Sequence, residues 1–198
     1  MRGPSCPGAW TELPRCVDRL GRGVNTSPSV RGCPASGNTN LMATVPIALR
    51  PCMESDVEIL ETTRNDPISA AFSRRGALSR ETITKDYILN PKKHTYMITA
   101  GIESLGYAVL EEESSHSDFL EISIAILPNA RGRGVAGRAL EVTREQAQTQ
   151  FPTKRGIHAW IHDSNEVSRR LFTRKGYVVS GETDVIAGQR LSQYELKW

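Results

Sequence analysis

Apolar and polar residues alternate in short stretches from about residue 45 to the C-terminus, and this pattern predicts a series of β-strands. In one stretch, Ile157, Ala159 and Ile161 occupy every second position, which places them on one face of a strand. The run Gly101-Ile102-Glu103 predicts a turn that joins two stretches into an antiparallel pair. The predicted strands cover residues 45–49, 95–99, 105–110, 120–127, 157–161, 177–182 and 191–197.

Capping residues predict two helices in the first half of this region. Ser55 and Glu58 have the spacing of a capping box, which opens a helix that reaches about Arg64. Ser79 is the predicted cap of a second helix over residues 80–89. Residues 68–78 between these helices are loop-like.

Helical spacing predicts two further helices in the second half. One runs to about Gln150 and places one face on a sheet. Asp163 and Glu166 form a second capping pair, which opens a helix that ends at Gly176 as its C-cap. The residues that define the face of the first of these helices are Ala136, Leu140, Thr143 and Ala147.

Residues 1–41 differ in composition from the rest of the chain. They are rich in Gly, Pro, Ser, Arg and Cys and have little hydrophobic periodicity. Because such a segment cannot bury enough apolar surface to offset its chain entropy, we expect a disordered N-terminal extension. The folded domain is expected to cover residues 42–198, with Met42 as a candidate start. The sequence leaves open whether the extension is a leader, a wrongly chosen start codon or a regulatory tail.

Charge and cysteine content exclude several classes of protein. The 198 residues carry a formal net charge of +3, and their basic residues form only short clusters, so no nucleic-acid partner is expected. The sequence has neither a bilayer-spanning apolar run nor a signal peptide, so we expect a cytoplasmic protein without membrane association. The cysteines lack C-x-x-C spacing, so we expect neither a metal site nor a disulfide scaffold. They are Cys6, Cys16, Cys33 and Cys52.

A glycine-rich run lies between the predicted strand 120–127 and the helix that follows. It reads Arg131-Gly132-Arg133-Gly134-Val135-Ala136-Gly137. Glycines leave backbone N–H groups uncovered, and a helix start adds unpaired donors and the positive end of the helix dipole. Strand, turn and helix start together predict a site that binds a pyrophosphate.

Two classes of ligand fit this site. The glycines spell G-x-G-x-x-G, the fingerprint of a dinucleotide site, and Asp163 lies roughly where a ribose-binding acid is sought. In that fingerprint, however, the first glycine follows its strand almost directly, whereas here residues 128–131 intervene. Arg131 and Arg133 also place two cations in the turn. The dinucleotide interpretation is therefore disfavoured.

The same residues match the pattern Q/R-x-x-G-x-G/A through Arg131, Gly134 and Ala136. This motif resembles the acetyl-CoA signature of the GNAT N-acetyltransferase superfamily. The similarity continues downstream in Asn165 and in the runs Arg169-Arg170-Leu171-Phe172 and Lys175-Gly176-Tyr177, which are similar to the family's N…RxLYxxxGF segment. It covers roughly residue 47 to the C-terminus.

The resemblance implies a fold and a co-substrate. It implies a single α/β (α+β) domain with a mixed sheet of about seven strands and about four helices, and acetyl-CoA as the acyl donor. It also implies that the central strand and the following strand splay apart, so that the pantetheine arm pairs with the backbone of Ile124, Ala125 and Ile126. The residues implied to hold the pyrophosphate are Arg131, Gly132, Arg133, Gly134, Val135, Ala136 and Gly137.

Glu121 is the candidate catalytic base that deprotonates the attacking amine. It lies on the central strand, where some GNAT enzymes place a glutamate, and desolvation by its apolar neighbours is expected to raise its pKa. Alternation places Glu121, Ser123 and Ala125 on one face of this strand. Two alternatives stay open: a surface glutamate paired with a lysine or arginine, and base catalysis through water from another group.

Phe172 occupies the position where many family members have the tyrosine that protonates the leaving thiolate. Phenylalanine cannot donate a proton, so the sequence leaves the general acid open, and water is an alternative donor. Tyr177 is expected to be a core residue. His158 and His162 are expected to be satisfied structural histidines rather than metal ligands or bases. Asn165 is expected to be a helix cap, a coenzyme A contact or both.

The acceptor is expected to be set by residues 64–90. The run Arg64-Asn65-Asp66 and the segment after it resemble those of GNAT members that acetylate amino groups on nucleotide sugars or protein N-termini. Arg74, Arg75 and Arg80 are either phosphate ligands of the acceptor or solvated loop charges. We therefore expect an N-acetyltransferase that takes acetyl-CoA and a small-molecule or peptide amine; a non-catalytic acyl-CoA-binding module is the alternative. Assembly as a homodimer stays open.

Overall fold

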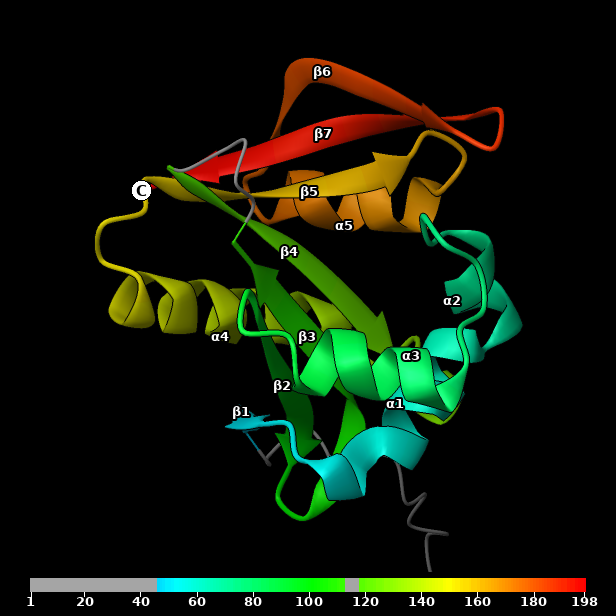
Figure 1. Cartoon of the computed structure of the whole chain (residues 1–198). Coiled ribbons are helices and arrows are strands. Elements are labelled where there is room, and N and C mark those ends of the chain that lie inside the picture. The colour runs from blue at the N-terminus through cyan, green and yellow to red at the C-terminus, as the bar shows by residue number, and fades with distance from the viewer. Residues whose placement is uncertain (1–45, 113–117) are drawn as a thin grey trace, which may run out of the picture. The chain divides into compact units, whose positions relative to one another are not determined.

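Seven β-strands form one mixed sheet in the computed structural model, which describes residues 46–112 and 118–198 (Figure 1). The strand order is β1-β2-β3-β4-β5-β7-β6. β4 and β5 run parallel, whereas the other neighbouring pairs are antiparallel. The strands are β1 (Ile47–Pro51), β2 (Lys93–Ala100), β3 (Glu103–Glu111), β4 (Phe119–Ile126), β5 (Gly156–His162), β6 (Val178–Ile186) and β7 (Gln189–Lys197). The predicted extension, residues 1–41, lies outside the described residues.

Within the described residues, five α-helices accompany the sheet. Residues 84–88 continue α3 as a turn of π-helix. The mixed seven-stranded sheet is confirmed, and the order of elements agrees with the prediction except for α2, which was not predicted. None of the described helices is long and apolar enough to cross a membrane. The α-helices are α1 (Val57–Asn65), α2 (Pro67–Ala71), α3 (Arg80–Ile83), α4 (Val135–Gln150) and α5 (Glu166–Arg174).

Helices cover both faces of the sheet, with α4 and α5 behind it in the view of Figure 1 and α1 and α3 in front. On the α4/α5 face, Leu120 and Ile122 of β4 pack with Leu140 of α4 and Phe172 of α5. On the α1/α3 face, the core consists of Leu60, Ile83, Met97, Tyr107 and Val109. Each face thus buries one set of alternating strand positions.

The predicted alternation along the central strand is confirmed. Leu120, Ile122 and Ile126 of β4 are buried on the α4/α5 face, where Ile124 also packs. Ala125 packs instead against the cluster on the α1/α3 face. Because strand side chains alternate, Glu121 and Ser123 share this second face with Ala125.

β4 and β5 are paired only at their first residues. The register joins Phe119 to Gly156, Leu120 to Ile157 and Glu121 to His158, and no further pair follows although both strands continue to Ile126 and His162. On its other edge, β4 stays paired with β3 as far as Ile126. The two parallel strands therefore diverge after Glu121, as the family resemblance implied.

The expectation of a loop over residues 68–78 is wrong in its first part, because α2 forms there. The carboxylate of Asp66 accepts hydrogen bonds from the amides of Ile68 (3.1 Å) and Ser69 (3.2 Å). Pro67 occupies the first helical turn, where its missing N–H has no cost. The pair Asp66-Pro67 is a helix-start signal that sequence reasoning missed.

The predicted capping box at Ser55 is also wrong, because Ser55 lies within a 3₁₀ turn before α1. The Asp56 carboxylate closes this 3₁₀ turn: it accepts from the amide of Met53 at 2.9 Å and from both terminal guanidinium nitrogens of Arg50 at 2.7 Å. The Arg50 hydrogen bonds lower the pKa of Asp56 against the effect of burial. Next to this cluster, burial raises the pKa of the Cys52 thiol to about 12.

The start of α5 differs from the prediction in the same way. Asp163 accepts a hydrogen bond from the hydroxyl of Ser192 at 2.7 Å and does not cap the helix. Asn165 is the cap, which confirms one of its two expected roles, because its side chain accepts from the amide of Ser168 at 3.1 Å. The predicted end of this helix at Gly176 is confirmed, with a φ of 87° there.

Candidate active site

The glycine turn after β4 has the open backbone that the sequence predicted. Gly132 and Gly134 have φ values of 73° and 75°, in the left-handed region that disfavours other residues. A Cβ atom on either glycine would have no atom within 4 Å, so this side of the turn is uncovered. Gly134 is the N-cap of α4, whose first backbone hydrogen bond runs from Arg138 N to Gly134 O at 3.3 Å.

The amides of Val135, Ala136 and Gly137 precede that hydrogen bond and have no acceptor within the helix. They lie at the positive end of a 16-residue helix dipole. Uncovered donors at a helix start, behind glycines that keep the approach open, fit the pyrophosphate of a coenzyme A molecule. The residues of the turn therefore match the chemistry of the ligand expected there.

Arg131 does not contribute a free cation to this turn. Its guanidinium donates to the Ile126 carbonyl at 3.0 Å, to Asp66 at 2.6 Å and to the Ser69 hydroxyl at 3.1 Å. The expectation of two cations in the turn is therefore wrong for the Arg131 side chain, while its main chain stays part of the turn. Arg133 is exposed and donates to the Asn129 carbonyl at 3.3 Å. Arg131 thus joins the end of β4 to the start of α2.

The gap between β4 and β5 begins just beyond Glu121. Along Ile124, Ala125 and Ile126, one edge of β4 is hydrogen-bonded to β3, and the other edge is not paired with β5. Alternate backbone groups of a strand point to opposite edges, so N–H and C=O groups of this segment face the gap. This segment leads directly to the glycine turn.

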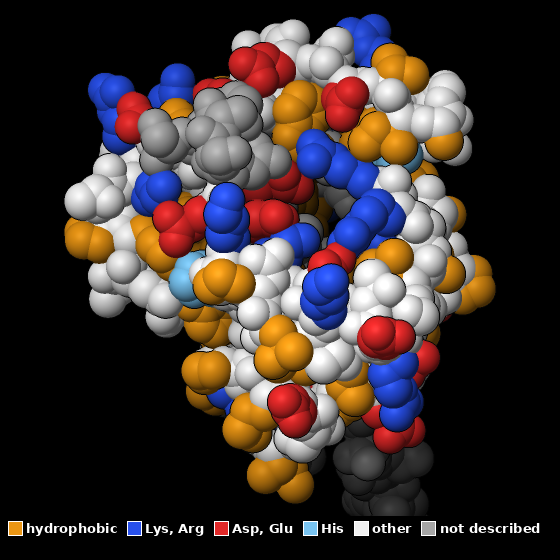
Figure 2. All heavy atoms as spheres, viewed as in Figure 1, with side chains coloured by type: hydrophobic (Ala, Val, Ile, Leu, Met, Phe, Trp, Pro, Cys, Tyr) orange, Lys and Arg blue, Asp and Glu red, His pale blue; other side chains and the backbone are white. Residues whose placement is uncertain are grey.

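Glu121 lies where β4 and β5 separate, on the α1/α3 face. Its side chain is only 15 % exposed, and its carboxylate is 3.6 Å from Nη1 of Arg74. The Arg74 guanidinium also lies over the ring of Trp160, 5.1 Å from the centroid. Figure 2 shows acidic and basic side chains gathered around a hollow in this face of the molecule. Glu121 is thus both paired with an arginine and largely desolvated.

His162 is one of the two histidines expected to be satisfied structural residues. It is 4 % exposed, and neither ring nitrogen has a hydrogen-bond partner among the described residues. Its ring packs edge-on against Phe72, with 6.0 Å between the centroids. No hydrogen bond among the described residues therefore supports the expectation of a satisfied structural histidine at His162. His158 is buried beside Phe119 and keeps its structural interpretation.

Phe172 and Tyr177 are core residues. Their rings pack edge-on at 4.8 Å between centroids, and both side chains are buried on the α4/α5 face. The core role predicted for Tyr177 is confirmed. Burial also raises the pKa of its phenol.

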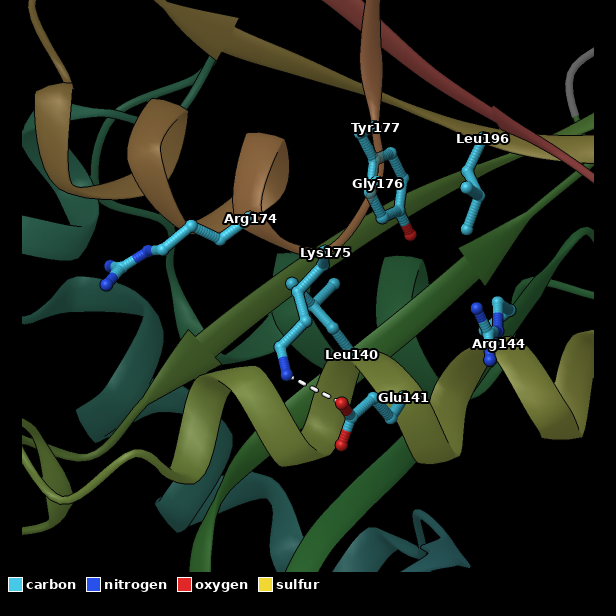
Figure 3. Close-up of a pocket in the computed structure, with 8 residues that line it drawn as sticks. All are labelled: Leu140, Glu141, Arg144, Arg174, Lys175, Gly176, Tyr177 and Leu196. Atoms are coloured by element: carbon cyan, nitrogen blue, oxygen red, sulfur yellow. Dashed lines mark hydrogen bonds and ion pairs between the residues drawn. The ribbon is translucent and has the colours of Figure 1, made fainter.

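A cavity of about 370 Å³ lies beside Tyr177, between α4 and the end of α5 (Figure 3). In this view the Tyr177 hydroxyl points toward α4, and Lys175 donates to Glu141 at 2.6 Å.

Hydrogen bonds from the end of α1 hold the segment expected to set the acceptor, residues 64–90. Arg64 is buried and donates to the Tyr87 hydroxyl at 2.9 Å and to the Gly76 carbonyl at 2.7 Å. Asn65 donates to the carbonyl of Leu78 at 2.7 Å and accepts from its amide at 2.8 Å. These contacts give Arg64 and Asn65 a structural task, namely to hold residues 76–78 against α1.

Three of the arginines in the acceptor segment, Arg74, Arg75 and Arg80, are in contact with acidic side chains. Arg80 donates to Glu61 at 2.7 Å, and Arg75 is paired with Asp86. Arg74 lies beside Glu121, as described above. Among the described residues, no group of three or more His, Cys, Asp and Glu side chains is placed to hold a metal ion.

A diverging parallel strand pair and a glycine turn that opens a helix are the features that the resemblance to the GNAT family implied. The family model described as an acetyltransferase (GNAT) domain matches residues 47–178, and the chain belongs to this family. Acetyl-CoA, which the sequence motif predicted, is the co-substrate of this family.

Individual relatives are more distant. The chain is 29 % identical over 119 residues to a mycothiol acetyltransferase of Paenarthrobacter aurescens. The match covers 59 % of this chain and 35 % of that protein, so the chain spans about a third of the length of this curated relative.

Solved structures share the fold. A spermidine N-acetyltransferase from Vibrio cholerae, in complex with CoA and spermine, has a TM-score of 0.65 at 17 % identity and covers 76 % of this chain and 95 % of its own. A putative phosphinothricin N-acetyltransferase has a TM-score of 0.65 at 18 % identity and covers 76 % of this chain and 98 % of its own. At these identities the structural likeness bears on the fold alone.

Proposed function

We propose that this chain transfers the acetyl group of acetyl-CoA to a primary amine by direct attack in a ternary complex. The observation that carries the proposal is the position of Glu121 at the point where β4 and β5 separate. Acetyl-CoA held along Ile124 to Ile126 and at the glycine turn places its thioester near this point. The acceptor then approaches from the α1/α3 face, which carries Glu121.

The reaction needs one proton to leave the amine and one to reach the thiolate. The neutral amine nitrogen attacks the thioester carbon, and the C–O double bond opens to a tetrahedral oxyanion, which a backbone N–H of β4 stabilises. Glu121 accepts the proton of the amine, directly or through water. The C–S bond then breaks, and the carbonyl re-forms as the amide.

Phe172 cannot protonate the leaving thiolate, so water supplies this proton. A thiol of ordinary pKa, about 8.5, makes the thiolate a fair leaving group without a protein acid. Asn165 remains a candidate contact of coenzyme A in addition to its role as a cap.

The acceptor we propose is a small-molecule or peptide amine. Arg75 and Arg80 are engaged with Asp86 and Glu61, which leaves Arg74 as the cation nearest to Glu121 among these three. This arrangement disfavours an acceptor with several phosphates, such as an amino-sugar nucleotide, because two of the three arginines already have acidic partners. An amine attached to a neutral or singly charged body fits the site better.

Ligand screening and one substitution test the proposal. Acetyl-CoA and CoA are expected to raise the melting temperature in proportion to the logarithm of their concentration, whereas NAD and NADP are not. Thiol release with a panel of amines then separates an enzyme from a non-catalytic acyl-CoA-binding module.

Glu121→Gln is expected to lower kcat by about 10²- to 10⁴-fold and to leave acetyl-CoA affinity unchanged. Glu111→Gln is the matched control, because Glu111 lies opposite Glu121 on β3 and is paired with Lys93 at 3.1 Å. The control is expected to keep its turnover. Unchanged turnover of Glu121→Gln across the pH range would remove Glu121 from the mechanism.

A further inference from the structure

Two fully enclosed polar side chains on neighbouring strands lack hydrogen-bond partners. Both ring nitrogens of His162 on β5 and both amide atoms of Gln193 on β7 are buried, and no described residue bonds to them. The side chains are 4 % and 0 % exposed. Buried polar groups are nearly always paired, so two unpaired groups in one place need an explanation.

The two side chains lie on the same face of the sheet, close to each other. The β5–β7 register pairs Trp160 with Gln193 and His162 with Leu191, so His162 and Gln193 are diagonal neighbours. Diagonal neighbours in an antiparallel pair are about 7–8 Å apart at Cα. Ile161 of β5 is buried on the α4/α5 face, so His162 and Gln193 point to the opposite face, which carries Glu121.

Residues of the acceptor segment cover this pair. Phe72 lies edge-on against His162, and Arg74 lies over Trp160, the residue opposite Gln193, and reaches Glu121. Phe72 is 36 % exposed and the Arg74 side chain 34 %, so both residues that lie next to the enclosed pair also reach solvent. The unpaired groups are thus continuous with the side of the molecule from which the acceptor approaches.

The chemistry of the pair selects a neutral ligand that both donates and accepts. Neutral imidazole has one donor and one acceptor nitrogen, and the glutamine amide has two donor hydrogens and an acceptor oxygen. A planar amide offers the complementary N–H and C=O, and the flanking rings of Phe72 and Trp160 suit a planar group. A phosphate or carboxylate offers acceptors alone and leaves the Gln193 oxygen unpaired.

We propose that His162 and Gln193 form a second subsite of the acceptor cleft, which binds an amide group of a peptide-like amine. This inference rests on the proposed function, because it takes Glu121 as the position of the reacting amine. From Glu121, two strand spacings of about 4.8 Å and two residues of about 3.3 Å place Gln193 roughly 12 Å away. An extended peptide covers this distance in three to four residues, so the subsite reads the third or fourth residue from the amine.

Apolar replacements of similar shape test the subsite. Gln193→Leu and His162→Phe remove the polar atoms and keep most of the volume. Binding to the CoA-saturated protein is measured by calorimetry with a tetrapeptide amide that has a free N-terminus, and with an alkylamine of equal length without amides. We expect each variant to weaken peptide binding at least tenfold, to leave alkylamine and CoA binding unchanged, and to melt at a higher temperature than the wild type.

Thr95→Val is the matched control. The hydroxyl of Thr95 on β2 is also buried without a partner among the described residues, but Thr95 lies on a strand separated from β5 by β3 and β4. Its replacement is expected to raise the melting temperature in the same way and to leave peptide binding unchanged. A rise in stability with no effect on binding then identifies a merely structural position.

Three results would overturn the subsite, and one would contradict the proposed function alone. Equal affinity of the wild type for peptide and alkylamine overturns the subsite, as does unchanged peptide binding in both variants. A lower melting temperature with unchanged binding indicates that a buried water satisfies the two side chains, and it also overturns the subsite. Peptide binding that depends on His162 and Gln193 without any acetylation leaves the subsite standing and contradicts the proposed function.

Discussion

Gly134 has two separate effects at the start of α4, because it adopts a left-handed conformation and also leaves the neighbouring amides uncovered. Its φ is 75°, and a Cβ atom there would meet nothing within 4 Å. Space is therefore available for a methyl group, but the conformation is strained for any residue that carries one. The same methyl group would stand in front of the amides proposed to hold the pyrophosphate.

Gly134→Ala is expected to lower the free energy of unfolding by about 1–2 kcal/mol and to weaken acetyl-CoA binding at least tenfold. Gly188→Ala supplies the control, since Gly188 has a φ of 76° in the turn between β6 and β7 and also has no atom within 4 Å of its Cβ position. Both variants should lose similar stability in urea unfolding. Equal acetyl-CoA affinity in the two variants would contradict the role of the glycine turn.

The Arg131 side chain shows why part of the candidate site could not be predicted from the sequence. The motif predicts where its main chain lies, because the strand, turn and helix signals are local. Its guanidinium instead meets Asp66, 65 positions earlier in the chain. His162 is a similar case, because its lack of partners depends on the segment that folds over it. Contacts of this kind are set by tertiary packing.

At the scale of elements, α2 is attached to the end of β4 by an ion pair. Asp66 caps α2 and accepts from Arg131, and the two side chains are 13 % and 28 % exposed. Burial alone disfavours the charged carboxylate, but the hydrogen bonds from Arg131 and from the amides of Ser69 and Ile68 outweigh it and lower the pKa of Asp66. The short helix that leads to the acceptor segment thus depends on a charge next to the glycine turn.

Asp66→Asn keeps a good cap and removes the charge, so it isolates the contribution of the ion pair. At pH 7 the variant is expected to be less stable by about 1–2 kcal/mol. Because the folded-state pKa of Asp66 is lowered, its contribution is fully present above the unfolded value near 3.9 and is lost as the pH falls through the lower folded value. The difference between wild type and variant should therefore shrink below about pH 4.

Urea unfolding as a function of pH measures this difference. Asp118→Asn is the control, because Asp118 is 54 % exposed and its pairing with Arg155 at 3.1 Å is a surface ion pair. Its stability should match the wild type at each pH. A difference between wild type and Asp66→Asn that stays constant down to pH 2 would contradict the role of the Asp66 charge.

Most elements were predictable because their signals are local. Alternation along β4, the cap at Ser79 and the stop at Gly176 each depend on a few neighbouring residues, and the structure confirms them. The errors arose where a more distant partner engaged a candidate cap. Arg50 donates to Asp56, which closes the 3₁₀ turn that contains Ser55. Ser192 donates to Asp163, and Asn165 caps α5.

At the scale of the whole molecule, the proposed reaction takes place at the gap between β4 and β5. In this proposal acetyl-CoA lies along β4 and the glycine turn, and the acceptor approaches from the α1/α3 face. The family could be predicted from the sequence, because the glycine turn and the order of elements together indicate it, and the family model confirms it. The segment proposed to set the acceptor, residues 64–90, has side chains that contact one another and the sheet across long separations in the sequence. Such long-range contacts cannot be predicted from local sequence signals.

Deletion of residues 1–40 is expected to leave the folded domain intact. The family model begins at residue 47, and the described strands and helices all lie beyond residue 46. The shortened chain should melt with the same midpoint and cooperativity as the full chain in calorimetry and keep its affinity for acetyl-CoA. A broadened transition or a large fall in its midpoint would show that the removed residues take part in the fold.

The thiol of Cys52 has a practical consequence for every assay that follows coenzyme A release. Of the four cysteines, only Cys52 remains in a chain shortened to residues 41–198. Burial raises its pKa to about 12, so almost none of it is thiolate near neutral pH. A chromogenic disulfide reagent should therefore react with newly released cofactor and scarcely with the protein, which makes slow acceptors visible above the background colour.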